Sequence, residues 1–139
     1  MAWESKLRSC GLEMTATPPI PDAIPPAKAI LAVAGGRVRP EVAAEKSARG
    51  LRILDEHWKV LHAKLASHTG EFLIILWGPG SMEAGWFQVT ERNDPLGLPS
   101  RVASVIGRPE FCCLSLDNKT LYAVTVEEDE YWIVTHQFS

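Results

Sequence analysis

Residues 71–77, with the sequence EFLIILW, decide the fold because they form a strand-like run with no polar face. A strand with one solvent-facing side alternates apolar and polar residues, whereas residues 72–76 are apolar on both alternating faces. We therefore predict that this segment is a central strand of a sheet and that protein layers cover it on both sides, at least in part.

Further strands are predicted after this one along the chain. They cover residues 85–91, 110–116, 120–128 and 130–138. Asp117, Asn118 and Lys119 are typical of a tight hairpin turn, so neighbouring strands are expected to run antiparallel. Residues 98–107 predict a short helix that is stopped by Gly107.

The longest helix is predicted to begin at Pro40-Glu41 and to end over residues 67–70. An apolar stripe with a 3-4-3-4 spacing supports it, formed by Leu51, Leu54, Trp58, Leu61 and Leu65. Charged residues occupy the opposite face. Gly50, within this segment, marks either a weak point or a place of close packing.

These elements predict an α+β fold, in which one long amphipathic helix and shorter helices pack on a mostly antiparallel sheet of about five strands. The 139 residues suit a single domain, 1–139, with the core in residues 41–139. Residues 1–40 are proline-rich and are expected to wrap this core. Within them, residues 3–14 predict a short helix, and residues 27–40 predict either a helix or a buried strand.

Composition narrows the classes of function. The net charge of −3 argues against nucleic-acid binding. Three cysteines, two of them adjacent, do not form a disulfide framework and favour a reducing, cytoplasmic setting. No segment approaches the roughly 20 apolar residues of a membrane span. No cofactor motif and no zinc-ligand spacing is present in the sequence, so neither a cofactor nor a metal is expected.

Aromatic residues are the candidate binding residues. Trp77, Trp86, Tyr122, Tyr131 and Trp132 all fall on predicted strands, and His136 lies on the last one. Tyr131 and Trp132 point to opposite faces, so one helix layer cannot bury both. The second face is therefore expected to meet the N-terminal segment, a second subunit or a small ligand.

The loop between Gly78 and Gly85 begins with Gly-Pro-Gly. A phosphate-binding loop would normally lead into a helix, whereas this loop is followed by a predicted strand. We interpret it as a turn, with a place at the rim of a pocket as the alternative.

The sequence thus predicts a small binding or accessory protein that takes a protein partner or an apolar small molecule on its aromatic residues. Two alternatives stay open. The first is a small enzyme with a pocket between helix and sheet. Its acid or base would be His136, Glu83 or Glu91, or a nucleophilic thiol of the pair Cys112-Cys113 would be activated by His136. The second is a structural homodimer that buries a sheet face or edge.

Overall fold

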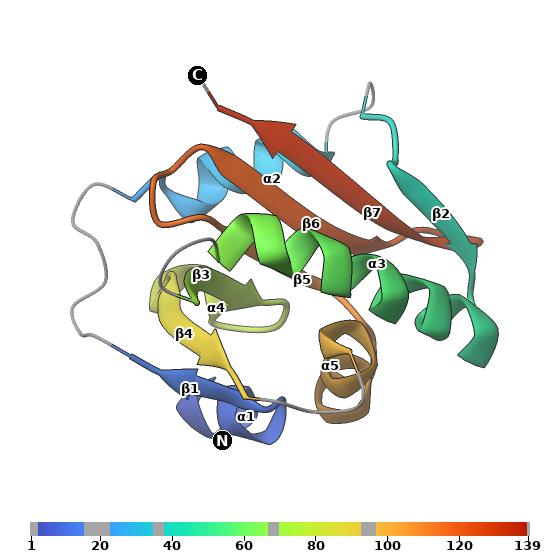
Figure 1. Ribbon diagram of the computed structural model, residues 1–139, viewed down its shortest axis with the longest axis horizontal. Coiled ribbons are helices and arrows are strands. Elements are labelled where there is room, and N and C mark those ends of the chain that lie inside the picture. The colour runs from blue at the N-terminus through green and yellow to red at the C-terminus, as the bar shows by residue number, and fades with distance from the viewer. Residues whose placement is uncertain (1–2, 16–22, 35–37, 67–69, 93–96, 139) are drawn as a thin grey trace.

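The structure of the protein is a computed structural model, and it describes residues 3–15, 23–34, 38–66, 70–92 and 97–138 (Figure 1). Helices pack on an antiparallel sheet, which confirms the predicted fold class. The helices are α1 (Trp3–Ser9), α2 (Pro26–Ala34), α3 (Ala48–Ala66), α4 (Ser81–Ala84) and α5 (Leu98–Ile106). The strands are β1 (Leu12–Met14), β2 (Val42–Glu45), β3 (Glu71–Leu76), β4 (Phe87–Glu91), β5 (Phe111–Leu114), β6 (Thr120–Val126) and β7 (Glu130–Gln137).

The sheet has seven strands in the order β1-β4-β3-β5-β6-β7-β2, and each pair of neighbours is antiparallel. All five predicted strands are present. The prediction of about five strands missed β1 and β2, which are short and form the two edges of the sheet. β3 lies inside the sheet between β4 and β5, and residues 72–76 are all buried. The prediction of a central strand covered on both sides is therefore confirmed.

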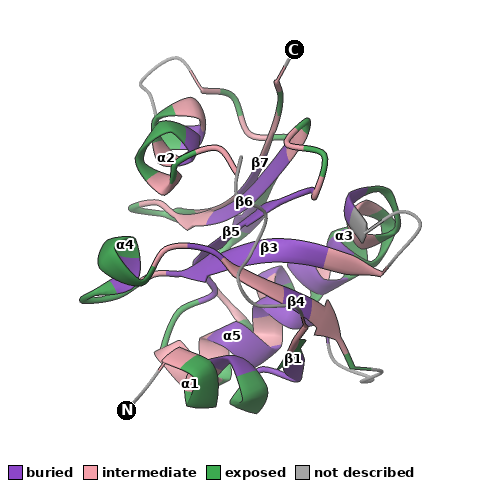
Figure 2. Ribbon diagram, turned by 90° about the vertical axis from the view of Figure 1, so that its left-hand side faces the viewer, coloured by how far each residue is buried: buried purple, intermediate pink, exposed green. Residues whose placement is uncertain are grey.

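Two apolar cores lie on opposite faces of the sheet, and Figure 2 shows α2 and α3 on opposite sides of it. We call these faces the α3 face and the α2 face. The α3 face is covered by α3, α5 and α1, through residues such as Trp58, Val102 and Leu7. The α2 face is covered by α2, through Ala29 and Val33. Of the three expected occupants of the second face, the N-terminal segment is therefore present there, through residues 23–34.

The apolar stripe of the long helix is confirmed in α3, where Leu54, Trp58 and Leu65 are buried against the sheet. The predicted start at Pro40 is wrong, because residues 42–45 pair with β7 as a strand and α3 begins only at Ala48. Ser47 explains this start, since its hydroxyl accepts the backbone N–H of Gly50 at 3.1 Å and caps the helix. The helix was predicted to end over residues 67–70, and residues 67–69 lie outside the described residues.

The predicted helix over residues 3–14 is also shorter than expected. α1 ends at Ser9, and Gly11 has a left-handed φ of 81°, a backbone conformation that stops a helix. The following residues 12–14 then pair with β4 as β1. Residues 26–34 form a helix rather than a strand, which settles that alternative. Residues 16–22 of the proline-rich stretch and residues 35–37 lie outside the described residues.

Local signals in the second half of the chain are confirmed. α5 ends at Ile106, and Gly107, whose φ is 98°, caps it. The turn between β5 and β6 holds Asn118 at a φ of 64°, a conformation that asparagine tolerates well. Two placements are corrected: Trp77 lies just after β3 and Trp86 lies just before β4, so neither is part of a strand.

Gly50 is a position of close packing, because a Cβ atom there would lie 1.7 Å from the backbone oxygen of Glu45. In an unobstructed helix, changing glycine to alanine stabilises by about 0.5–1 kcal/mol. We expect Gly50→Ala instead to lower the free energy of unfolding by about 2 kcal/mol, since α3 must shift away from β2. Urea denaturation measures this change.

The control is Ala63→Gly at an exposed position of the same helix, which should cost about 1 kcal/mol through helix propensity alone. A Gly50→Ala variant that is more stable than the parent protein would show that α3 and β2 are not held this close.

Candidate functional site

A surface groove with a volume of about 400 Å³ contains the first of the predicted aromatic residues, Trp77. We call it the Trp77 groove. Three separate parts of the chain form it: α1, the loop after β3, and the end of α5. Its lining residues are Lys6, Trp77, Gly78, Pro79, Val105, Ile106 and Arg108. This volume lies within the range of roughly 300–1,000 Å³ that is typical of small-molecule sites.

The Gly-Pro-Gly loop contributes directly to this groove through Gly78 and Pro79. Gly78 has a φ of 149°, and a Cβ atom there would lie 3.0 Å from the ring of Trp3. The glycine therefore leaves room for the indole of α1 to lie against the loop. The chain does turn here, as expected, and the turn contains the short helix α4 rather than an open loop.

Lys6 supplies a positive charge at the groove. Its ammonium group lies 4.4 Å from the centroid of the Trp3 ring, in the geometry of a cation–π contact. Lys6 forms no ion pair with any residue that the structure describes. The aromatic ring of Trp3 thus orients the ammonium group of Lys6, a residue that lines the groove.

Arg108 is held by a buried carboxylate. Its Nη2 and Nε atoms lie 2.7 Å and 2.9 Å from Oε1 of Glu110, whose side chain is 7% exposed. The other oxygen of Glu110 accepts the backbone N–H of Val126 at 3.2 Å. Arg108 is therefore fixed in position, and its charge is largely balanced. It can still donate hydrogen bonds into the groove from a guanidinium that has five N–H groups.

The other predicted binding residues are not brought together around Trp77. Trp86 is buried in the core of the α2 face, and its indole N–H donates to the carbonyl of Ile24 at 2.6 Å. Trp132 is half-buried on the same face, and Tyr131 packs on the α3 face. Trp86 thus meets the chain's own N-terminal segment, and Trp132 packs against the core of the α2 face.

Tyr122 and His136 lie elsewhere again. Tyr122 is 1% exposed beneath α3, and the hydroxyl group has no hydrogen-bond partner among the described residues. His136 is half-buried on β7, with its ring 4.6 Å from that of Phe138. Neither residue lines the Trp77 groove.

The candidate acid and base groups are also spread over the molecule. Glu83 is exposed on α4, Glu91 forms a buried ion pair on the α3 face, and His136 is on β7. The expected pairing of a thiol with His136 is wrong. Cys112 and Cys113 are on β5, His136 is on β7, and β6 lies between these two strands. Burial raises the pKa of Cys112 to about 12, which leaves the thiol un-ionised near neutral pH.

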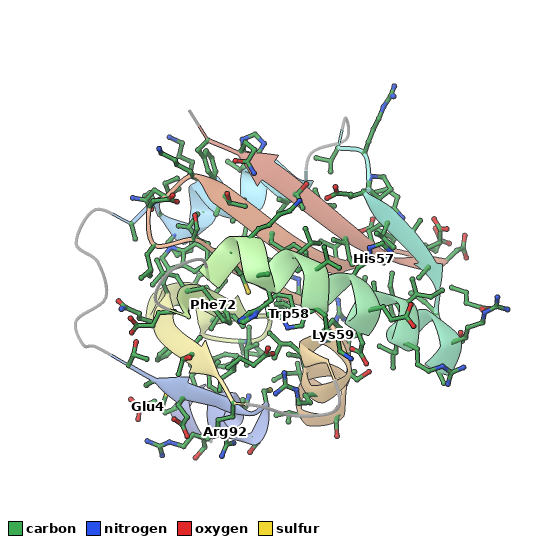
Figure 3. All side chains as sticks on the ribbon, in the orientation of Figure 1. Glu4, His57, Trp58, Lys59, Phe72 and Arg92 are labelled. Carbon is green, nitrogen blue, oxygen red and sulfur yellow. The ribbon has the colours of Figure 1, made fainter. Side chains whose placement is uncertain are left out.

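A polar cluster that the sequence did not reveal lies between α3, α5 and β4. The indole N–H of Trp58 donates to both carboxylate oxygens of Glu91, at 3.2 Å and 3.0 Å. Arg101, 7% exposed, forms an ion pair with the same carboxylate. The side chain of Trp58 extends from α3 toward Phe72 (Figure 3). The centroids of the two rings lie 5.8 Å apart. This cluster fastens α5 to the sheet and has the character of a structural element.

The described residues hold neither a metal-ligand cluster nor a membrane-spanning helix. Among them, no group of three or more His, Cys, Asp or Glu side chains is placed to hold a metal ion. Within the described ranges, no helix is long and apolar enough to cross a lipid bilayer.

The Glu91–Arg101 pair leads to a stability prediction. Glu91→Ala leaves the guanidinium of Arg101 buried without a counter-charge, and it also removes the acceptor of the Trp58 indole. We expect the free energy of unfolding to fall by about 3 kcal/mol, as measured by urea denaturation.

Glu13→Ala serves as its control, because Glu13 lies 4.0 Å from Arg92 in a pair that is half-exposed on both sides. That substitution should change the free energy of unfolding by no more than about 0.5 kcal/mol. Equal effects of the two substitutions would contradict a structural role for the buried pair.

Comparison with known proteins gives no relative: no protein-family model, no curated protein and no solved structure significantly matches the chain. The geometry of the Trp77 groove is therefore the basis for the functional conclusion.

Proposed function

We propose that this protein is a binding protein that holds a small apolar molecule with an anionic group in the Trp77 groove. The observation that carries this proposal is the combination of an aromatic wall with a cation that has no ion-pair partner among the described residues. The proposal keeps the expectation of an apolar ligand and adds the charge that the groove favours.

The apolar part of the ligand is supported by the walls of the groove. Trp77, Val105 and Ile106 are all half-buried, so each presents apolar surface to the groove while it is anchored in the fold. Pro79 adds a rigid apolar face. Small-molecule sites are typically of this kind, mostly apolar with a few placed polar groups.

The anionic group is supported by Lys6 and Arg108. They are the charged residues of the lining, and both are positive. Because Glu110 balances Arg108, Lys6 supplies most of the attraction, while Arg108 offers hydrogen-bond donors at a fixed position. A carboxylate or sulfonate on an apolar body matches this arrangement.

Binding is favoured over catalysis by the chemistry of the lining. Its titratable groups are a lysine and an arginine, and neither is paired with a second acid or base within the groove. The other groups considered for catalysis, Glu83, Glu91 and His136, do not line it. The groove therefore offers groups that can recognise a ligand. It lacks the closely placed acid and base side chains that acid–base catalysis requires.

The first test uses 1-naphthoate as the probe and the full chain as the protein. We expect saturable binding of 1-naphthoate and clearly weaker binding of neutral 1-naphthalenemethanol, measured by NMR line broadening of the probe. Trp77→Ala should weaken naphthoate binding roughly tenfold through lost aromatic contact. Lys6→Gln should weaken it roughly two- to fivefold, because the charge is partly exposed.

Matched controls are Trp132→Ala on the α2 face and Lys59→Gln on the exposed side of α3. Folded controls should bind 1-naphthoate as the parent protein does. If Trp77→Ala folds and binds the probe unchanged, or if the neutral probe binds equally well, the assignment of the groove is wrong.

A second candidate, association through a protein partner or a second copy of the chain, is favoured by the outer side of α2. Leu31 on this helix is 76% exposed, the highest value among the large apolar residues of the described chain. Ala27 and Ala34 are exposed at helical spacing on either side of it. Single exposed leucines are common on protein surfaces. The feature that matters here is that Ala27, Leu31 and Ala34 are all exposed on one side of the helix.

Native mass spectrometry tests this second candidate. If α2 forms a homodimer interface, the parent protein should show a dimer that Leu31→Asp abolishes without lowering the thermal midpoint of unfolding. Lys28→Asp, on the same exposed side of the helix, controls for added negative charge. A parent protein that stays monomeric at high concentration would rule out the homodimer.

A further inference from the structure

The polar side chains that line the Trp77 groove are all hydrogen-bond donors. They belong to Lys6, Trp77 and Arg108, and the remaining lining residues have apolar side chains or none. An ammonium group, an indole and a guanidinium donate hydrogen bonds and accept none. A ligand in the groove therefore meets side-chain donors, and it meets no side-chain acceptor among the lining residues.

The carboxylate that contacts this lining is already engaged. Oε1 of Glu110 accepts the Nε–H of Arg108 at 2.9 Å, and Oε2 accepts the backbone N–H of Val126 at 3.2 Å. The Glu110 side chain is 7% exposed and is not part of the lining. A hydroxyl or amino group of a ligand would thus gain no carboxylate acceptor from Glu110.

Trp77 supplies a donor that the fold does not use. Three other tryptophans, Trp58, Trp86 and Trp132, each donate the indole N–H to a protein acceptor. The indole N–H of Trp77 has no acceptor in the part of the chain that the structure describes, and it is not one of the buried unpaired groups there. It is therefore open to solvent, where an atom of a ligand can reach it.

Arg108 also keeps donors for a ligand. Glu110 engages its Nε and Nη2 atoms, whereas Nη1 has no partner among the residues described. The side chain of Arg108 is 53% exposed, so the protein does not enclose these N–H groups. Together, Lys6 and Arg108 can hold one carboxylate, and the indole N–H of Trp77 is then left for a second acceptor.

We propose that the ligand of the Trp77 groove is an apolar acid with a second hydrogen-bond acceptor, such as a ketone oxygen, and that the indole N–H of Trp77 recognises this acceptor. The inference rests on the proposed function, in which Lys6 and Arg108 take the carboxylate. An acceptor gains a partner in this lining, whereas a hydroxyl or amino hydrogen at the same place finds no side-chain acceptor.

Two derivatives of 1-naphthoate with matched shapes test the second acceptor. 4-Acetyl-1-naphthoate carries a ketone oxygen, and 4-isopropenyl-1-naphthoate carries a CH₂ group in its place. Burial of apolar surface alone favours the isopropenyl compound. We expect the acetyl compound to bind the full chain about two- to fivefold more tightly, through one hydrogen bond between neutral groups, as measured by NMR line broadening of the probe. Equal binding, or tighter binding of the isopropenyl compound, would contradict the proposal.

Trp77→Phe keeps an aromatic ring in the wall and removes the N–H. This variant should lose the preference for the acetyl compound, because both probes then meet the same apolar ring. Trp132→Phe makes the same substitution on the α2 face and should keep the preference. If a folded Trp77→Phe variant still prefers the acetyl compound, another donor holds the ketone and the role of Trp77 is wrong.

The indole ¹⁵N–¹H signal of Trp77 gives a direct readout of this contact. It is identified in the spectrum of the ¹⁵N-labelled full chain by its absence from that of Trp77→Phe. The acetyl compound should move the proton downfield, and the isopropenyl compound should move it much less. A purely structural role of Trp77 would not distinguish the two probes, so equal shifts would overturn the assignment.

Unsubstituted 1-naphthoate separates this inference from the proposed function. If 1-naphthoate binds and the acetyl group brings no gain, the second acceptor is wrong while the assignment of the groove stands. If none of the three naphthoates binds in a saturable way, both conclusions are wrong.

Discussion

The requirement to bury both faces of β3 determines the rest of the architecture. Residues 72–76 are apolar without interruption, so neither face of this strand can be left to solvent at an acceptable free-energy cost. One amphipathic helix covers only one face of a sheet. The chain therefore needs two layers of helices, and it forms them from α3 with α5 on one side and α2 on the other. The two faces thereby receive different environments, and the buried ion pair of Glu91 and Arg101 lies on the α3 face.

Most of the fold was accessible from the sequence because its signals are local. Gly107 and Asn118 are residue types that suit left-handed backbone, and they mark the end of α5 and the turn between β5 and β6. The start of α3 was misjudged because proline followed by an acid resembles a helix N-terminus, while Ser47 is the residue that caps it. β1 and β2 have three and four residues, too few to show an alternating pattern, and they become strands only through pairing with β4 and β7.

The candidate site was far less accessible. Trp77 was singled out as an aromatic residue, but the groove also needs Lys6 from α1 and Arg108 from beyond α5, and tertiary packing alone brings these together. No local pattern links positions so distant in the chain. Trp86 and Tyr122 were singled out by the same reasoning, and they proved to be buried on opposite faces. Residue type therefore identified side chains suited to recognition, while the fold decided which of them face a groove.

The strand order also constrains how the protein is made. β1 and β2 come from the N-terminal third of the chain, yet they pair with β4 and with β7, the last strand in the sequence. The helix α2 docks on residues of β3, β5, β6 and β7. During translation, this apolar helix therefore emerges from the ribosome long before its docking surface exists. Residues 23–34 must therefore stay undocked until β7 is synthesised, because that strand contributes Val134 to the core that they join, and until then their apolar side chains are open to chaperones.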